Sequence, residues 1–143
     1  MSRIIAGSAG GTRLATPPGD RTRPTTDRVR EALFSTLATW NGSSDAGADA
    51  QLDKVAFCDL YAGSGGVGLE AASRGGGPVV LVEHDASTAR LIKQNAVKAH
   101  LTAAVETASV DTFLQRAGGA FDVIWLDPPY PFTNEQVSHT LSL

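Results

Sequence analysis

The chain has 143 residues, of which 42% are hydrophobic, and its formal net charge is −3. This length is enough for one domain with a sizeable core. No stretch approaches the roughly 18 apolar residues of a membrane span, and the first residues do not resemble a secretory signal, so we expect no membrane partner. A single cysteine, Cys58, excludes an intramolecular disulfide and is typical of a protein in the reducing cytoplasm.

Charge is distributed unevenly along the chain. Residues 1–31 hold six arginines against three acidic residues, whereas the remainder holds six basic and twelve acidic residues. A basic N-terminal segment on an acidic body predicts contact with an anionic partner at that end. A solvated arginine-rich face without a partner explains the charge equally well.

Two short extended pieces, 3–6 and 12–15, begin the chain, and the glycine-rich stretch 7–11 between them predicts a β-hairpin. A turn-rich segment with three prolines follows at 16–24. We treat 1–24 as a separate hairpin and basic segment.

A helix is expected to begin near Thr26 or Asp27, since either side chain can cap it. Its apolar positions recur at helical spacing, and we expect them to form its inward face: Val29, Leu33, Phe34, Leu37 and Trp40. Residues 41–53 are rich in Gly, Ser, Ala and Asp and predict a flexible loop.

From residue 55 onward, strand and helix patterns alternate. Strands are expected at 55–61, 79–83, 103–107 and 121–126, and helices at 67–74, 87–100, 111–117 and 134–141. Such alternation predicts an α/β fold, a Rossmann-like parallel sheet flanked by helices, for the domain 25–143. In these sheets ligands bind beyond the carboxyl ends of the strands.

A glycine-rich turn follows the first of these strands. Gly63–Gly68 matches G-x-G-x-x-G between a strand and a helix, and Glu83 ends the next strand, 20 residues after Gly63. The glycines permit a tight turn and close approach of a ligand, and the acid can accept hydrogen bonds from ribose hydroxyls. A purely structural turn is the alternative.

Asp59 ends the first strand, four residues before Gly63. A carboxylate at this place would repel the pyrophosphate of a dinucleotide but suits the sulfonium and ammonium of S-adenosylmethionine. The motif therefore favours S-adenosylmethionine, and a nicotinamide-dependent oxidoreductase is the weaker alternative.

The second motif, Asp127-Pro128-Pro129-Tyr130, follows the apolar strand Val123–Leu126. Asp127 and the Pro128 carbonyl can accept the two N–H bonds of a planar exocyclic amine, and Tyr130 can stack on the ring that bears it. A strand that ends in an ordinary proline turn is the alternative.

Together these residues resemble the class I S-adenosylmethionine-dependent methyltransferases. More narrowly, the chain resembles the bacterial 16S rRNA guanine-N2 methyltransferases of the RsmD type. The stretch 23–34 carries the narrower resemblance, whereas many amino-methyltransferases share the other matching stretches, which are 3–7, 59–65 and 127–130.

The resemblance implies methyl transfer to the exocyclic amine of a guanine in 16S rRNA of the 30S subunit, with S-adenosylhomocysteine as product and no metal. It implies catalytic roles for Asp127, Pro128, Pro129 and Tyr130. It implies cofactor contacts from Thr25, Asp59, Tyr61, Ala62, Gly63, Ser64, Gly65, Glu83, His84, Ser109, Val110 and Asp127. It implies RNA contacts from Arg3, Arg13, Arg21 and Arg23.

The chain departs from this family at Ser109, where an Asn or Asp is common near the adenine amine; Asp111 is another candidate for that contact. Cys58 is expected to pack in the core, as is Trp125, and the histidines lack metal-ligand spacing. The target could also be a DNA adenine or a protein amide.

Class I methyltransferase sheets usually have seven strands, and four are predicted here. We therefore expect the C-terminal strands to be missing, which would leave 123–126 as an exposed apolar edge and favour self-association. A remnant that binds cofactor or RNA without catalysis is a further alternative.

Overall fold

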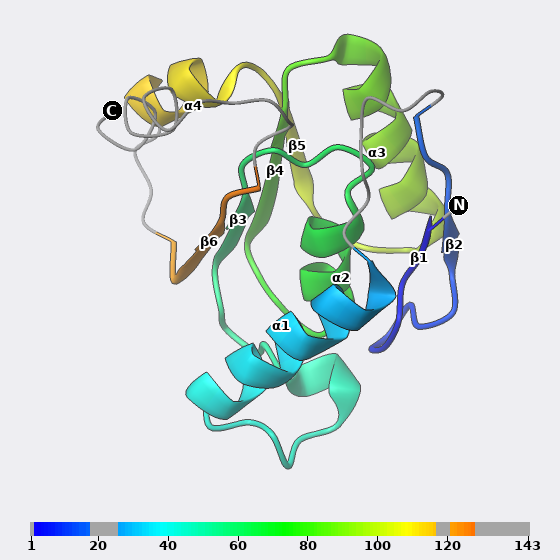
Figure 1. Cartoon of the computed structure of the whole chain (residues 1–143), viewed down its shortest axis with the longest axis vertical. Coiled ribbons are helices and arrows are strands. Elements are labelled where there is room, and N and C mark those ends of the chain that lie inside the picture. The colour runs from blue at the N-terminus through cyan, green and yellow to red at the C-terminus, as the bar shows by residue number, and fades with distance from the viewer. Residues whose placement is uncertain (1, 18–25, 117–120, 128–143) are drawn as a thin grey trace.

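The computed structural model describes residues 2–17, 26–116 and 121–127 (Figure 1). Every strand and helix that the sequence predicts within these ranges is present, with ends shifted by a few residues. The elements are β1 (Ser2–Arg3), β2 (Arg13–Leu14), α1 (Asp27–Trp40), the 3-10 helix η1 (Ala48–Ala50), β3 (Phe57–Asp59), α2 (Gly66–Ser73), β4 (Val79–Glu83), α3 (Ala86–Lys98), β5 (Ala104–Thr107), α4 (Val110–Arg116) and β6 (Val123–Trp125). The helix expected at 134–141 lies outside the described residues.

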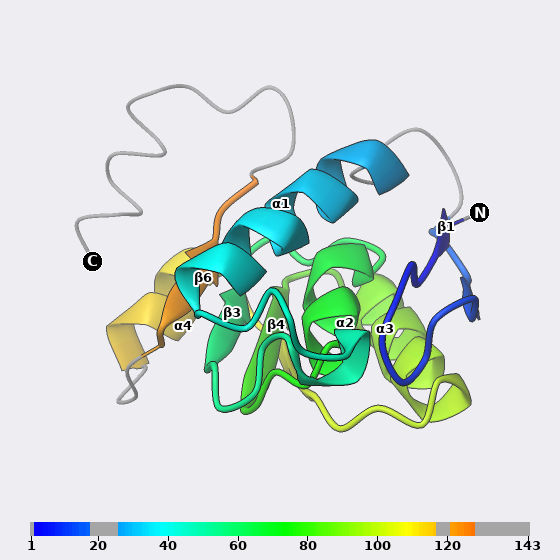
Figure 2. The same ribbon diagram turned by 90° about the horizontal axis from the view of Figure 1, so that it is seen from below.

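Four parallel strands form the central sheet in the order β5-β4-β3-β6. The chain moves outward from β3 to β5 and then returns to place β6 on the other side of β3. The switch point of the sheet therefore lies between β3 and β6, where Asp59 pairs in register with Trp125. This is the predicted α/β architecture, and Figure 2 shows α2 and α3 on one side of the strands and α4 on the other.

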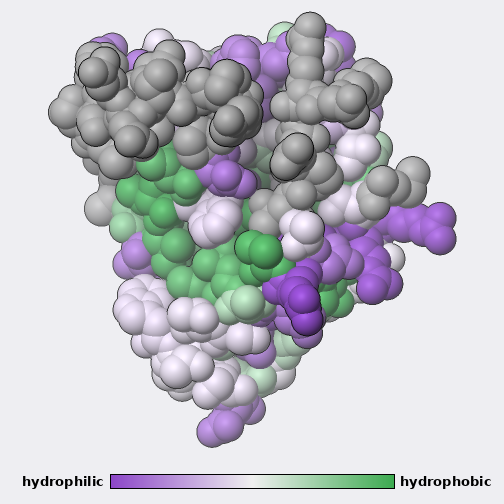
Figure 3. Space-filling view, viewed as in Figure 1, coloured by the Kyte–Doolittle hydropathy of each residue, from purple (hydrophilic) through white to green (hydrophobic). Residues whose placement is uncertain are grey.

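Within the described part of the chain, β6 pairs with β3 alone and lies at the edge of the sheet. Ile124 at its centre is 53% exposed. Figure 3, which has the same view as Figure 1, shows an apolar area in green on the face toward the viewer. The predicted exposed apolar edge is therefore present among the described strands.

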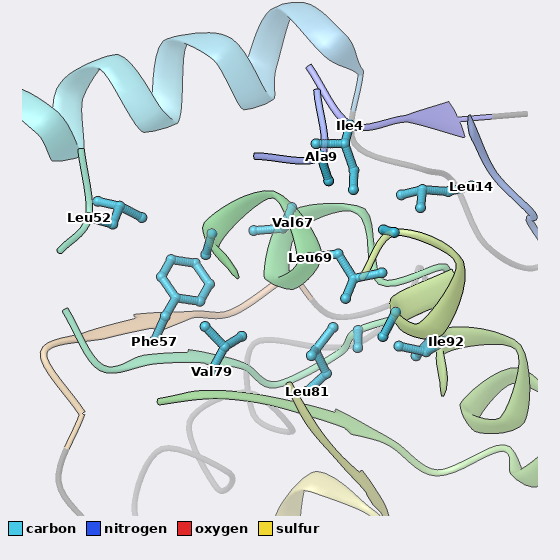
Figure 4. Close-up of a cluster of buried hydrophobic side chains, with 14 of the residues drawn as sticks. Ile4, Ala9, Leu14, Leu52, Phe57, Val67, Leu69, Val79, Leu81 and Ile92 are labelled. Carbon is cyan, nitrogen blue, oxygen red and sulfur yellow. The ribbon is translucent and has the colours of Figure 1, made fainter. Parts of the chain in front are cut away.

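Alternate residues of the strands feed two apolar clusters, one on each face of the sheet. The larger cluster joins Phe57, Val79 and Leu81 of the strands to side chains of α2, α3 and the hairpin (Figure 4). Phe34 of α1 belongs to the same cluster. The smaller one joins Cys58 and other strand residues to α4. Both faces of the sheet are therefore covered, as parallel sheets require.

Helix α1 begins as predicted, because Thr26 caps it by accepting a hydrogen bond from the Val29 amide at 3.3 Å. The predicted inward face is partly wrong. The helix buries Arg30, Phe34 and Ala38, which are spaced at i and i+4. Val29 is exposed and Trp40 is 59% exposed, so Trp40 is not a core residue. The buried face of α1 includes the charged residue Arg30, which an apolar pattern alone does not predict.

The segment 41–53 folds back on the protein, which the prediction of a flexible loop did not foresee. Leu52 is fully buried, and its amide donates to the Arg74 carbonyl at 2.9 Å. The Asp49 backbone lies against Gly75, where an added Cβ would approach the Asp49 carbonyl oxygen to 2.5 Å. Gly75 also has φ +96°, so this contact requires glycine.

The N-terminal hairpin pairs β1 with β2 in antiparallel register, as predicted. Ile4 and Leu14 lie fully buried in the larger cluster, and Ser73 of α2 donates its hydroxyl to the Ala6 carbonyl at 2.6 Å. The hairpin therefore shares the core of the sheet. The division proposed at residue 24 falls outside the described residues and stays a prediction. Among the described helices, none combines the length and apolarity that crossing a bilayer needs.

Candidate functional site

Three carboxylates lie at the carboxyl ends of the neighbouring strands β3, β4 and β6. Asp59 and Glu83 end their strands, and Asp127 follows β6 by two residues. The charges of Asp127 and Glu83 both act on Asp59. The structure thus brings together three of the residues that the sequence predicted for one site.

Asp59 is buried, and its two carboxylate oxygens differ in their surroundings. Oδ2 accepts a hydrogen bond from the Gly68 amide at 3.0 Å, whereas Oδ1 has no hydrogen-bond partner among the described residues. Burial, with the nearby charges of Asp127 and Glu83, raises the pKa of Asp59 to about 7, although the Gly68 amide acts in the opposite direction. The site therefore has a negative potential and an available acceptor, which suit a cationic ligand and disfavour a pyrophosphate.

The glycine loop forms the predicted turn between β3 and α2. Gly63 and Gly65 have φ of 55° and 86°, which L side chains rarely adopt, and Gly65 caps α2. A side chain at Gly68 would come within 2.5 Å of Leu81 Cδ2. The first two glycines therefore shape the turn, and the third lets α2 pack closely on β4.

Glu83 connects the end of β4 to the glycine loop. Its Oε1 accepts from the Gly63 amide at 3.0 Å and its Oε2 from the Asp85 amide at 2.9 Å. Each carboxylate oxygen has a further lone pair, so both can still accept from a ligand hydroxyl. His84 is exposed, with Nδ1 3.5 Å from Glu83 Oε2.

Ser109 has a local role that the sequence reasoning missed. Its hydroxyl accepts from the Thr112 amide at 3.1 Å and donates to the Thr112 hydroxyl at 2.8 Å, at the start of α4. The spacing S-x-x-T before an apolar residue was the available signal. Val110 is buried in the smaller cluster, so its side chain serves packing.

The remaining predicted residues divide into two groups. Tyr61 is half-buried, Ala62 and Ser64 are buried, and Arg3 and Arg13 are exposed. The others lie outside the described residues and stay predictions: Arg21, Arg23, Thr25, Pro128, Pro129 and Tyr130.

Arg30 belongs to a buried network of charged side chains. It is one of the six arginines that make residues 1–31 basic. Its Nη2 donates to Asp27 Oδ1 at 2.6 Å, and this hydrogen bond lowers the pKa of Asp27. Its Nη1 lies 3.7 Å from Glu70 Oε1. Glu70 is fully buried, and its Oε2 accepts from Arg74 Nε at 2.9 Å. Arg30 is therefore unavailable to an external anion.

Cys58 packs in the core, as predicted. Burial, with the neighbouring Asp59 charge, raises the pKa of the Cys58 thiol to about 12, so it is unreactive as a nucleophile at neutral pH. Nowhere in the described ranges do three or more His, Cys, Asp or Glu side chains gather as metal ligands.

Comparison with known proteins gives consistent family matches. The family described as "Conserved hypothetical protein 95" matches residues 2–143. The chain is 39% identical over 129 residues to ribosomal RNA small subunit methyltransferase D of Escherichia coli strain K12, covering 90% of this chain and 60% of that protein. The protein of the same name from Haemophilus influenzae is 33% identical over 135 residues, covering 91% of this chain and 64% of the relative.

The fold also matches solved structures. A hypothetical protein of Thermus thermophilus, TTHA0928, superposes with a TM-score of 0.84 and 36% identity, over 99% of this chain and 77% of that one. The chain thus spans about three fifths of the length of the curated relatives it matches and most of a solved one.

Proposed function

We propose that the chain methylates the N2 amine of a guanine in 16S rRNA. The proposal starts from its family, because the chain belongs to the conserved hypothetical protein 95 family of RsmD-type methyltransferases. The observation that carries the proposal is the buried Asp59 beside the glycine loop, with one carboxylate oxygen that no described residue contacts by a hydrogen bond. The printed names of the relatives support an rRNA substrate.

The residues present fit S-adenosylmethionine as the methyl donor. This cofactor supplies an electrophilic methyl group on a sulfonium and also carries an ammonium. Asp59 and the loop 61–65 would hold its charged end, and Glu83 would accept from its ribose hydroxyls. The negative charges of Asp127 and Glu83 near Asp59 suit a cationic ligand and disfavour the pyrophosphate of a dinucleotide at the same place.

Asp127 would hold the target amine. It is exposed, and it lies beyond the edge strand β6. Its carboxylate would accept one N–H of the amine and the Pro128 carbonyl the other, which positions the nitrogen for displacement at the methyl carbon. The amine would become acidic only on accepting the methyl group, as the S–C bond of the donor breaks and S-adenosylhomocysteine leaves. Asp127 would therefore hold the N–H during the transfer and need not remove the proton beforehand. Positioning and electrostatics then supply most of the rate.

Tyr130 would stack on the guanine ring after the base leaves its own stack. Contact between the tyrosine ring and the base face is worth about 1–3 kcal/mol per base in other proteins. Thr25, His84, Ser109 and Val110 complete the proposed cofactor site.

The RNA contact is proposed on the hairpin side of the molecule. Arg3 and Arg13 are exposed there, and Lys98 of α3 donates to the Arg13 carbonyl at 3.0 Å. Helix α3 carries no acidic residue, and its basic residues are all exposed: Arg90, Lys93 and Lys98. Such a surface suits phosphate contacts that position the RNA without reading its sequence. Arg21 and Arg23 would extend it, and 30S subunits in the cytoplasm would be the partner.

Incubation with labelled S-adenosylmethionine tests this proposal. We expect label on a guanine of 16S rRNA in 30S subunits, and none on duplex DNA or on a protein amide. Label on DNA adenine or on a protein amide would show that the substrate is not rRNA and would contradict the proposal. Full labelling by the Asp127→Ala variant would contradict the assigned role, and Asp45→Asn, in the exposed loop 41–53, is the matched control.

A further inference from the structure

Asn95 on α3 joins two backbone segments that are far apart in the sequence. Its side-chain nitrogen donates to the Ala15 carbonyl at 3.0 Å and to the Ser64 carbonyl at 3.3 Å. Its side-chain oxygen accepts from the Ala15 amide at 3.0 Å. Ala15 directly follows β2, and Ser64 lies in the glycine loop. Asn95 is 2% exposed, so its amide group is shielded from solvent.

Arg30 on α1 makes a second connection of the same kind. Its Nη2 donates to the Arg3 carbonyl of β1 at 2.7 Å, and its Nη1 donates to the Gly66 carbonyl at 3.3 Å. The Arg30 side chain is fully buried. Arg30 and Asn95 come from different helices, yet each contacts the hairpin backbone at one end and the glycine loop at the other.

The two connections meet the loop on either side of Gly65. Ser64 and Gly66 supply the accepting carbonyls, and Gly65 between them has the left-handed φ of 86°. A shift of the hairpin would leave buried donors unpaired, and an unpaired buried donor costs more than its hydrogen bond contributes. The hairpin position and the loop conformation therefore depend on each other.

We propose that Asn95 and Arg30 are positioning residues that couple the N-terminal hairpin to the glycine loop, so that RNA contact on the hairpin and cofactor binding in the loop strengthen one another. The link between hairpin and loop depends only on the hydrogen bonds above. The identity of the two ligands depends on the proposed function. Such coupling is reciprocal, because each ligand changes the affinity of the other by the same factor.

Hydrogen exchange of the ligand-free chain tests the link itself. Ala15→Pro removes the amide that donates to Asn95, without touching the glycine loop. We expect it to accelerate exchange in residues 60–68 by roughly fivefold or more. Unchanged exchange in 60–68, with faster exchange in the hairpin, would overturn the link.

The second experiment measures exchange with and without S-adenosylhomocysteine. In the unchanged chain the ligand should slow exchange in 2–16 as well as in 60–68. Asn95→Leu should weaken the effect on 2–16, because only the Arg30 connection remains. Arg30→Lys should retain more of the effect than Arg30→Met, because lysine keeps a donor. Leu52→Ala lowers stability at a buried site that touches neither connection, so ligand protection of 2–16 should persist. Protection confined to 60–68 in the unchanged chain contradicts the coupling.

The last arm adds 30S subunits and measures the dissociation constant of S-adenosylhomocysteine. The subunits should tighten binding by roughly 5- to 150-fold in the unchanged chain and by a smaller factor in Asn95→Leu. Equal tightening in both proteins would overturn the role of Asn95. If S-adenosylhomocysteine protects the hairpin but no methyl transfer occurs, the proposed function fails and the link stands.

Discussion

Asp59 and Asp127 lie at the carboxyl ends of neighbouring parallel strands, but their surroundings differ. Asp59 ends β3, which is paired on both sides, and it is buried with a fixed partner in Gly68. Asp127 follows β6, which is paired on one side among the described strands, and it is exposed. The proposed cofactor half therefore has a fixed, buried carboxylate, whereas the carboxylate of the proposed substrate half is exposed and accessible to a large partner.

Of the substitutions that test this difference between the cofactor and substrate halves, Asp127→Ala should have the largest effect on activity. We expect methyl transfer to fall by at least roughly 100-fold, as for loss of other groups that stabilise developing charge. Binding of S-adenosylhomocysteine, measured by calorimetry, should stay within a few-fold. Loss of binding and activity together would show that the two halves are not separable.

The pH dependence of cofactor binding should report on Asp59. A cationic ligand favours the ionised carboxylate, and the pKa of Asp59 in the free protein is raised to about 7 by burial and nearby acids. Affinity for S-adenosylmethionine should therefore fall roughly tenfold for each pH unit below 7 and level off above it. Asp59→Asn should bind weakly at every pH, and a similar pH dependence in that variant would contradict the assignment.

The same carboxyl group should affect stability with the opposite sign. Its pKa is 3.8 in the unfolded chain and about 7 in the folded one, so the folded state holds the proton more tightly. Its stabilising contribution is present below 3.8 and is lost as the pH rises to about 7. The free energy of unfolding, measured in urea, should fall over this range relative to Asp59→Asn. A constant difference between the two proteins would show that Asp59 has an ordinary pKa.

Gly68→Ala tests the close packing of α2 on β4 beside Asp59. The added methyl would lie 2.5 Å from Leu81 Cδ2, so either the buried Leu81 side chain or α2 must shift. We expect a loss of about 1–3 kcal/mol in the free energy of unfolding. Gly47→Ala, where only the flexible Asp49 carboxylate is near, is the control and should change stability little. Equal effects would mean that close packing at Gly68 is unimportant.

Ile124→Lys should have the smallest effect, on self-association through the edge of β6. Burial of an isoleucine is worth about 1.5–3 kcal/mol, and a lysine on an edge strand opposes pairing. Sedimentation should show about tenfold weaker self-association. Val97 is 76% exposed on α3, away from the edge, so Val97→Lys should leave association unchanged. Association that both changes weaken equally would indicate a different surface.

Local sequence patterns were sufficient to predict the strands, the helices and the glycine loop among the described residues. The apolar run at 79–83 matches β4 at both ends, and the tight turn between β3 and α2 forms where the glycine pattern predicts it. Long-range polar contacts were not predictable, because a side chain's distant partners leave no periodic signal. Asn95 lies 80 residues from Ala15, and Arg30 resembled a surface charge until its partners were visible.

Glu70 has a consequence for the order in which the chain can fold. Its two carboxylate oxygens accept from the amides of Ile5 and Ala6 at 2.8 and 3.1 Å, across about 65 residues of sequence. A growing polypeptide exposes its first residues long before α2 has been synthesised. The hairpin therefore waits, with its backbone incompletely paired, until α2 has been made. Docking of the hairpin therefore cannot precede the synthesis of α2, although the hairpin lies about 65 residues earlier in the sequence.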